Sequence, residues 1–570
     1  MSAAAPQAAM MSGGQPTRDR WPGTGLRLLV VLASLGLGAW LGLRGLATPS
    51  PRPLNATDFS AIRASDAARR LLGDQPRPAG SAANAAAVQR LAAFLRARKM
   101  DVEVQEATVH AGGRDVPIRN IVARRTGAMP GKAVMVVAHH DSAPASPGAG
   151  DDGMGVAVAL ELSGALATDS WPGRDIIILL TDGEESGLLG ARHFAENHRW
   201  MADVGTVVNV DNRGNAGPCL LYETGPESAA VLEEAASALA PVVANSLFAE
   251  ISRHMPYTTD FRVFRERGLR GLNFAVVDGH AHYHQPTDNW SNADLSSLQH
   301  QGAVVLPVVY ALSMARADRP AIEGDAVFLD VAGSVLAWWP ARAGVVASVA
   351  CLLALPVTAW VGARRSQASK RALVLGVLVT LMRGVVAAGV TWLTLWLLER
   401  VGMFGMQAAV EALPEADMPT RARAAFWPAS GAMLLTVSML AGLVTAWFAT
   451  QPLLRACDGF LLLCGNWTAL AAVTTALAVT LPGVTAPLLP ALLAATIALA
   501  ALVLLLDRRD GRAALAVTAV ATFLIGLTLA PIQALAWSGV GLGMPALTAV
   551  TSALLAAVLL AGAAAPARGA

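Results

Sequence analysis

Cysteine is scarce in this chain, and its few positions limit the possible chemistry. Only four cysteines occur in 570 residues. Cys351, Cys457 and Cys464 lie in or beside apolar stretches, so Cys219 stands alone in the rest of the chain. A disulfide framework and a cysteine-ligated zinc site are therefore both excluded.

Charged residues are scarce in the second half of the chain. Residues 330–570 hold 8 acidic and 14 basic residues, whereas the first 329 residues hold 33 and 29. A polar part is therefore joined to a part suited to a lipid bilayer. The formal net charge of +2 and the lack of long Lys/Arg runs give no reason to expect a nucleic-acid partner.

Long apolar runs mark the expected membrane segments. Residues 1–25 are rich in Gly, Pro and Ala and are predicted to be a disordered cytoplasmic tail. Residues 26–47 can span a bilayer, and their length and basic flank favour a retained anchor over a cleaved signal peptide. A connector at 321–340 precedes a membrane domain at 341–570 of about seven helices, and Trp338–Trp339 is a candidate re-entrant or interfacial piece. The expected helices are 343–361, 372–398, 431–450, 459–481, 486–506, 513–532 and 545–563.

Arginine clusters predict how these eight spans are oriented. Clusters at 364–371, 455 and 508–512 fall on the same side as the basic N-terminus, whereas the opposite loop, 399–430, carries Glu411, Glu415 and Asp417 together with Arg400, Arg421 and Arg423. The positive-inside rule then places both termini in the cytoplasm and the polar domain outside it. With 40 arginines and only 3 lysines the composition is typical of a GC-rich bacterial genome, which indicates an inner membrane and a periplasmic domain.

Residues 56–320 alternate short apolar runs with helical patterns. Buried strands are predicted at 134–138, 176–180, 207–210, 220–222 and 272–277, because these runs are short, apolar and rich in β-branched residues. Helices are predicted at 85–98, with Asn84 as the N-cap, and at 154–166. The alternation predicts an α/β domain with a mixed, largely parallel twisted sheet flanked by helices. Ligands are expected at the carboxyl ends of its strands.

Acids and histidines gather in five segments, most of which begin where a predicted strand stops. The segments are A-H-H-D-S at 138–142, G-A-G-D-D-G at 148–153, T-D-G-E-E-S at 181–186, V-N-V-D at 208–211 and Y-H-Q-P-T-D at 283–288. Each alone is also explained by a polar turn, a helix cap or a solvated loop. Together they supply the imidazoles and carboxylates of a two-metal hydrolase.

The first two segments offer a ligand, its support and a bridge. His139 and Asp141 share a face in an extended chain, so Asp141 can orient the His139 ring while the other ring nitrogen binds metal. His140 then points the opposite way. Asp152 is explained by capping the following helix, which leaves Asp151 as the better metal bridge.

The remaining segments offer a base, further ligands and a donor. Adjacent Glu184 and Glu185 can diverge, so that the first serves as general base and the second as metal ligand. Asp211 is either an ordinary strand-end acid or a ligand. His284 is the expected ligand of the last segment, and Tyr283 can donate to a developing oxyanion. The neighbouring histidines at 280 and 282 are interpreted as surface residues.

Taken in this order and spacing, the five segments resemble the two-zinc aminopeptidase family over residues 80–315. Y-E-T-G-P at 222–226, T-T-D-F-R-V-F at 258–264 and the multi-span half resemble its membrane-bound branch, typified by the endoplasmic-reticulum metallopeptidase and the fungal vacuolar membrane protease. The resemblance implies two zinc ions. Their ligands would be His139 and Asp211 on one ion, Glu185 and His284 on the other, and Asp151 between them. It also implies Glu184 as the base, with Asp141 and Tyr283 in support.

The resemblance implies hydrolysis of a peptide substrate with release of N-terminal residues, and Glu223 is a candidate to hold the substrate amine. One departure concerns Thr259-Asp260-Phe261, where many soluble relatives have Ser-Asp-His, so no role of that histidine is carried over and Asp260 is expected to be structural. Two alternatives stay open. In the first, the α/β domain is a non-catalytic ectodomain on a transporter or receptor. In the second, the membrane half is itself a transporter or channel, and Arg383 is then a functional rather than a structural charge.

Overall fold

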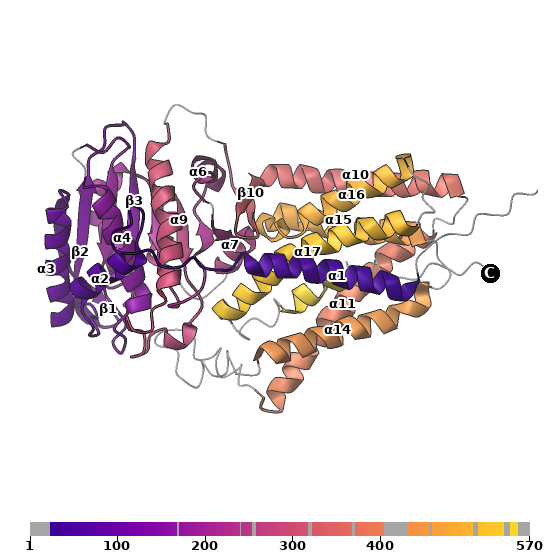
Figure 1. Ribbon diagram of the computed structural model, residues 1–570, viewed down its shortest axis with the longest axis horizontal. Helices are drawn as coiled ribbons and strands as arrows, with labels where there is room; N and C mark the ends of the chain where they lie inside the picture. The colour runs from indigo at the N-terminus through magenta and orange to yellow at the C-terminus, as the bar shows by residue number, and fades with distance from the viewer. Residues whose placement is uncertain are drawn as a thin grey trace, which may run out of the picture.

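A computed structural model describes an α/β part at one end of the molecule and a bundle of long helices at the other (Figure 1). The described residues are 23–167, 170–239, 241–253, 258–316, 322–366, 371–403, 431–454, 459–505, 511–540, 548–553 and 555–556. Most of the predicted tail and of the 399–430 loop therefore lies outside the described residues, as does most of the span expected at 545–563.

An eight-stranded sheet organises the α/β part, in the order β1-β2-β4-β3-β5-β8-β6-β7. Its strands are β1 (Asp101–Ala111), β2 (Arg114–Arg125), β3 (Ala133–His139), β4 (Ile176–Thr181), β5 (Val204–Val210), β6 (Leu220–Thr224), β7 (Val243–Ala244) and β8 (Arg270–Ala275). The central strands β4, β3, β5 and β8 are parallel, while β2 and β6 join them antiparallel. The predicted mixed, largely parallel sheet is confirmed, and all five predicted strands are present with shifted bounds.

Helices cover both faces of this sheet. One face carries α2 (Ala61–Leu72), α3 (Ala82–Ala97), α4 (Met154–Ala165), α6 (Ser228–Ala235) and α9 (Leu295–Met314), and the other carries α5 (Leu189–Asn197) and α8 (Asp260–Glu266). Along β3, Val134 and Val136 pack into the first layer, whereas Met135 and Val137 pack into the second. Burial on both faces is why the central strands are continuous apolar runs.

The N-cap prediction for the helix after Pro78 is wrong by three residues. Ser81 is the N-cap of α3, and its hydroxyl accepts a hydrogen bond from the Asn84 backbone N–H. Asn84 is buried, and its side-chain amide donates to Asp182 Oδ1 at 2.9 Å. The helix starts earlier than its apolar spacing suggests because a serine is the stronger cap and two alanines continue the helix from it.

The predicted connector at 321–340 contains an antiparallel hairpin of β9 (Ala326–Val331) and β10 (Val335–Pro340). Trp338 and Trp339 lie in β10, so they are not a re-entrant segment. Helix α10 (Ala341–Ser366) begins directly after Pro340. The first helix of the membrane part is thus attached to the α/β part by a short, hydrogen-bonded element.

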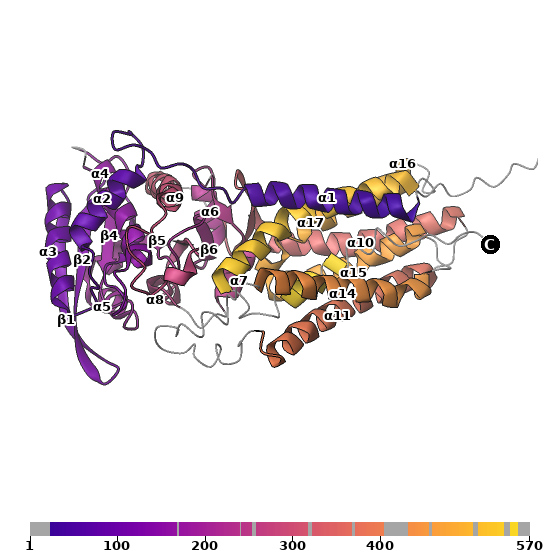
Figure 2. The same cartoon turned by 60° about the horizontal axis from the view of Figure 1, so that its bottom comes forward.

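Within the described ranges, six helices are long and apolar enough to cross a membrane. These are α1 (Thr24–Arg44), α10, α11 (Arg371–Arg400), α14 (Gly431–Leu454), α15 (Gly459–Thr480) and α17 (Gly511–Val540). The segment expected at 486–506 forms α16 (Leu489–Leu505), an apolar helix of 17 residues. Figures 1 and 2 both show α1 alongside α17, and a hydrogen bond of 2.6 Å joins Ser34 to Thr522.

Arg383 lies buried in the middle of α11. Its Nε donates to Thr450 Oγ1 at 2.9 Å, and its two terminal nitrogens have no hydrogen-bond partner among the described residues. Both roles predicted for this charge, structural and transport-related, are compatible with that environment. They stay predictions.

Candidate metal centre

Two groups of three potential metal ligands lie side by side and share Asp151. One group is His139, Asp151 and Asp211, and the other is Asp151, Glu185 and His284. Asp151 Oδ1 lies 3.0 Å from His139 Nε2, and its other oxygen, Oδ2, lies 3.1 Å from His284 Nε2. Each oxygen of one carboxylate therefore faces a different group, which is the arrangement of a bridging ligand.

The topology of the sheet brings these residues together. His139 is the last residue of β3, and Asp211 follows the last residue of β5. Glu185 lies in the loop after β4, and His284 in the longer loop after β8. Because β4, β3, β5 and β8 are neighbouring parallel strands, their carboxyl ends open at one edge, as expected for an α/β site.

Asp141 supports both groups at once. Its Oδ1 lies 3.4 Å from His139 Nδ1 and accepts a hydrogen bond from the Glu184 N–H at 3.2 Å. Its Oδ2 accepts from the Glu185 N–H at 3.3 Å. The carboxylate thus faces the nitrogen of His139 that points away from Asp151, and it also fixes the start of the Glu184–Glu185 loop.

The charge balance of this cluster suits bound cations. Burial, together with neighbouring carboxylates, raises the pKa of Glu184, Glu185 and Asp211 above their usual ranges. Burial alone would also raise the pKa of Asp151, but its hydrogen bonds to His139 and His284 hold that pKa below its usual range. Four carboxylates converge on only two imidazoles, so divalent cations would relieve their repulsion, and carboxylate oxygens with imidazole nitrogens are a zinc donor set.

Asp288 holds the loop that carries Asp151, a role that the sequence analysis missed. Its two carboxylate oxygens accept from the Gly150 N–H at 2.7 Å and the Asp151 N–H at 3.2 Å. Since Asp288 ends the same segment that supplies His284, one loop carries His284 and positions Asp151. The turn Gln285-Pro286-Thr287-Asp288 was the available signal, but a carboxylate that binds only backbone N–H groups has no spacing pattern of its own.

Asp152 is buried beside the metal centre without belonging to either group. It accepts a hydrogen bond from the Gly155 N–H at 3.2 Å in the first turn of α4, but the N-cap of α4 is Gly153, so Asp152, the predicted cap, lies one residue before the capping position. It also accepts from Asn212 Nδ2 at 3.2 Å. Asp151 and Asp152 both have non-helical dihedral angles, so α4 begins after them.

The other histidines of the motifs lie outside the two groups, as predicted. The His140 ring lies within hydrogen-bonding distance of the Arg119 carbonyl, 2.9 Å from Nε2, on the side away from His139. His280 and His282 form a short turn at the surface, η3 (His280–His282), and neither is fully buried. Asp260 accepts a hydrogen bond from the Thr181 hydroxyl at the end of β4, in keeping with its predicted structural role.

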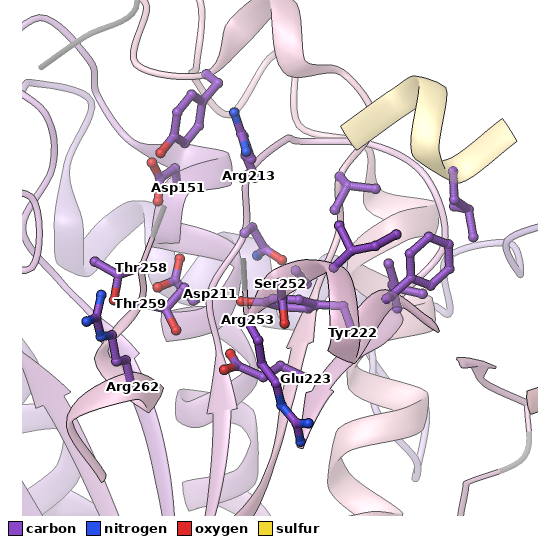
Figure 3. Close-up of a pocket in the computed structure, with 18 of the residues that line it drawn as sticks. Asp151, Asp211, Arg213, Tyr222, Glu223, Ser252, Arg253, Thr258, Thr259 and Arg262 are labelled. Atoms are coloured by element: carbon purple, nitrogen blue, oxygen red, sulfur yellow. The ribbon is translucent and has the colours of Figure 1, made fainter. Parts of the chain in front are cut away.

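A cavity of about 280 Å³ adjoins the metal centre (Figure 3). Asp151, Glu184, Asp211 and Tyr283 line it, so the predicted base and the predicted oxyanion donor face the same space. The Tyr283 ring stacks on the His284 ring with centroids 3.9 Å apart. This stacking fixes the tyrosine beside a ligand.

Glu223, the predicted partner of a substrate amine, also lines this cavity. Its Oε1 lies 2.5 Å from Arg265 Nη1, and its Oε2 accepts from Asn273 Nδ2 at 2.9 Å. An arginine that the sequence analysis did not consider therefore already pairs with this carboxylate. The predicted role in amine binding stays untested.

Comparison with known proteins agrees with the motifs. The model of peptidase family M28 matches residues 120–309. Endoplasmic reticulum metallopeptidase 1 of Homo sapiens is 30% identical over 58% of this chain and 41% of its own length. A vacuolar membrane protease of Yarrowia lipolytica is 34% identical over 34% of this chain and 20% of its own. The chain thus spans less than half the length of these curated relatives.

Solved structures with similar folds cover the α/β part. A zinc aminopeptidase from Bacillus subtilis is 18% identical, with 46% of this chain and 98% of that chain covered and a TM-score of 0.37. A glutaminyl cyclase from Porphyromonas gingivalis is 24% identical, with 45% and 100% covered and a TM-score of 0.37. The family match spans the segments that hold both ligand groups, so residues 120–309 are similar to peptidase family M28, and this part of the chain is joined to helices long and apolar enough to cross a membrane.

Proposed function

We propose that the protein is a membrane-bound, zinc-dependent peptidase that uses two zinc ions to remove N-terminal residues from peptides. The observation that carries the proposal is the Asp151 carboxylate, whose two oxygens face two complete groups of ligands. A non-catalytic ectodomain would have no need of both groups. The proposed ligands are His139 and Asp211 for one ion and Glu185 and His284 for the other, with Asp151 shared.

The chemistry assigned to the protein's own residues is acid–base catalysis with stabilisation of the oxyanion. Zinc, when bound, polarises the substrate carbonyl and acidifies a water molecule. Glu184 accepts a proton from the attacking water and delivers it to the leaving amine. The Tyr283 hydroxyl donates to the oxyanion of the tetrahedral intermediate, and Asp141 keeps His139 oriented.

Release of terminal residues is favoured by the shape of the cavity. The cavity begins at the metal centre and ends against buried apolar side chains, among them Leu220 and Phe248. An extended chain that continued past the scissile bond in this direction would meet these side chains. A terminal residue can be accommodated without that conflict.

Glu184→Gln is the first test of the proposal. The substitution keeps the size of the side chain and removes its ability to accept a proton, so kcat should fall by about 10²–10⁴-fold. Zinc content, measured by elemental analysis of the purified full-length chain, should match the wild type. Glu196→Gln, an exposed glutamate on α5 that pairs with Arg267, is the matched control and should change neither quantity. Wild-type turnover by the Glu184→Gln chain would disprove the assignment of the base.

We propose further that the peptidase domain faces away from the cytoplasm, across a bacterial inner membrane. Arg364, Arg371 and Arg512 lie at those ends of α10, α11 and α17 that are remote from the α/β part. Positive charge at that end of the bundle supports a cytoplasmic location for it. The curated relatives named above come from an animal and a fungus, so the bacterial membrane rests on composition alone.

A further inference from the structure

A helix of the membrane domain forms part of the wall of the cavity beside the metal centre. Leu535 and Ala536 of α17 line it together with residues of the α/β part. In Figure 3 a turn of helix in the yellow of the C-terminal region lies at the end of the pocket opposite Asp151 and Arg262. One wall of the candidate substrate site therefore comes from a segment far from the peptidase motifs in sequence.

The two ends of the cavity differ in chemistry. On the side of the metal centre the lining includes Asp151, Glu184 and Asp211, whereas the side formed with α17 is lined by side chains of one hydrophobic cluster. The apolar side chains that line it are Leu220, Phe248, Ile251, Val277, Leu535 and Ala536. An apolar surface that adjoins a hydrolytic centre is suited to an apolar substrate side chain, because burial of that side chain is favourable.

The position of α17 against the peptidase domain is well determined by packing. Leu220 and Phe248 belong to the same hydrophobic cluster as Ile532 and Leu535, and Ile251 and Val277 pack against that cluster. Leu535 and Ala536 are only 5% and 6% exposed. The wall is thus continuous with a core that the two domains share, and it is not a loose contact between separate bodies.

Hydrogen bonds next to this cluster join the domains as well. Ser246 Oγ, in α7 (Ser246–Ser252), donates to the Gly483 carbonyl at 3.2 Å, and the Gly483 N–H donates to Glu250 Oε1 at 3.3 Å. Gly483 belongs to η4 (Pro482–Thr485), the turn between α15 and α16. Helix α7 supplies Phe248 and Ile251 to the cavity. It is therefore held against the membrane domain by hydrogen bonds to Gly483 and by apolar packing.

We propose that α17 completes the side-chain subsite of the peptidase, and that this subsite selects peptides whose N-terminal residue is large and apolar. The inference rests on the proposed function and assigns a substrate class to the same site. Leu535 and Ala536 set the depth of the subsite. A membrane helix would thus determine which peptides are cleaved, whereas residues of the peptidase domain carry out the cleavage.

The test compares peptides that differ only in their first residue, with phenylalanine, leucine or alanine, and uses the full-length chain in detergent. Ala536→Leu fills the apolar end, so the ratio of kcat/KM for the phenylalanyl over the alanyl peptide should fall about tenfold. Leu535→Ala enlarges the same end and should shift the ratio of phenylalanyl to leucyl cleavage toward phenylalanine. Ala516→Leu, the same substitution at an exposed position of α17, is the matched control and should leave every ratio unchanged.

Ratios of kcat/KM separate a change of subsite from a general structural defect, since a damaged enzyme loses activity toward all three peptides in the same proportion. If Ala536→Leu lowers kcat/KM equally for all three peptides, or if both variants leave the ratios unchanged, the proposed role of α17 is overturned and the proposed function stands. Failure of the zinc-loaded wild-type chain to cleave any peptide would instead overturn the proposed function. Thermal unfolding of each variant without substrate shows which chains are folded, and Leu535→Ala still decides the matter if Ala536→Leu does not fold.

Discussion

At the scale of single residues, carboxylates in this site divide into those that face the ligand groups and those that position them. Asp151 is surrounded by imidazole nitrogens, whereas Asp141 and Asp288 accept hydrogen bonds from backbone N–H groups of the loops that carry ligands. Replacement of a carboxylate that positions a metal ligand commonly lowers the metal affinity by about 10–100-fold.

Asp288→Asn tests this division. An asparagine keeps one acceptor oxygen and replaces the other by a donor, so it cannot accept from both the Gly150 and the Asp151 N–H groups. Zinc affinity, measured by competition with a chromogenic chelator, should fall by about 10–100-fold. Asp74→Asn, at an exposed acid that pairs with Arg69, should leave the affinity unchanged. If both variants bind zinc as tightly as the wild type, Asp288 does not position the bridge.

Residue types and spacing predicted the residues that the structure brings together in the two groups, as well as Asp141 beside His139, but not the supporting Asp288. His139, Asp211 and Glu185 follow strands that are recognisable as apolar runs, so their shared edge could be inferred before the fold was known. Asp288 acts on backbone N–H groups, and Arg265 reaches Glu223 from a separate helix. Neither contact leaves a periodic trace in the sequence.

At the scale of secondary-structure elements, the predicted strands are those that are buried on both faces. The long hairpin of β1 and β2 was missed because β1 places charged and apolar residues on partly exposed faces, so that no continuous apolar run results. The hairpin of β9 and β10 was missed although both strands are apolar, because it lies in the short segment interpreted as a connector before the next membrane helix. It nevertheless packs under the membrane domain, where Val327 and Leu329 contact Ala486 in one buried cluster.

The turn η4 is the element where a small change should loosen the two domains. A Cβ atom at Gly483 would lie 2.5 Å from the Ser246 carbonyl oxygen and 2.6 Å from Glu250 Cγ. Gly483→Ala should therefore lower the free energy of unfolding by about 1–3 kcal/mol, seen as a lower Tm of the full-length chain in detergent.

Gly389→Ala is the control for this substitution. Gly389 lies within α11, and a Cβ atom there meets nothing within 4 Å, so its Tm should stay at or above that of the wild type. A Gly483→Ala chain as stable as the Gly389→Ala chain would mean that the contact at η4 is not tight.

At the scale of the whole molecule, the helices run lengthwise from the α/β part toward the opposite end of the bundle (Figure 2). Helices α1 and α17 run parallel and in contact, with Gly38 close to the Phe523 carbonyl and Gly42 close to the Leu527 carbonyl. Since α1 leads into the peptidase domain, both helices end beside it. In the proposed topology, the N-terminal end of α1 and the candidate active site lie on opposite sides of the membrane.

Labelling of introduced cysteines tests this orientation. Arg114→Cys lies at the exposed tip of the β1–β2 hairpin, and Gly25→Cys lies at the exposed start of α1. In cells with an intact inner membrane and a permeabilised envelope, in a chain whose Cys457 is replaced by Ser, an impermeant maleimide should label position 114 only. Permeabilisation of the inner membrane should expose position 25. The opposite pattern would reverse the proposed topology.

The contact of α17 with the substrate cavity also limits how far the peptidase domain can be treated as a portable module. Transfer of residues 56–320 to an unrelated anchor would keep both ligand groups, since all of their members lie within that segment. It would also remove the wall made by Leu535 and Ala536 and expose the apolar surface that α17 covers. With the proposed role of α17, the peptidase domain and its membrane helices form one functional unit, and exchange of the membrane anchor would change the substrate specificity.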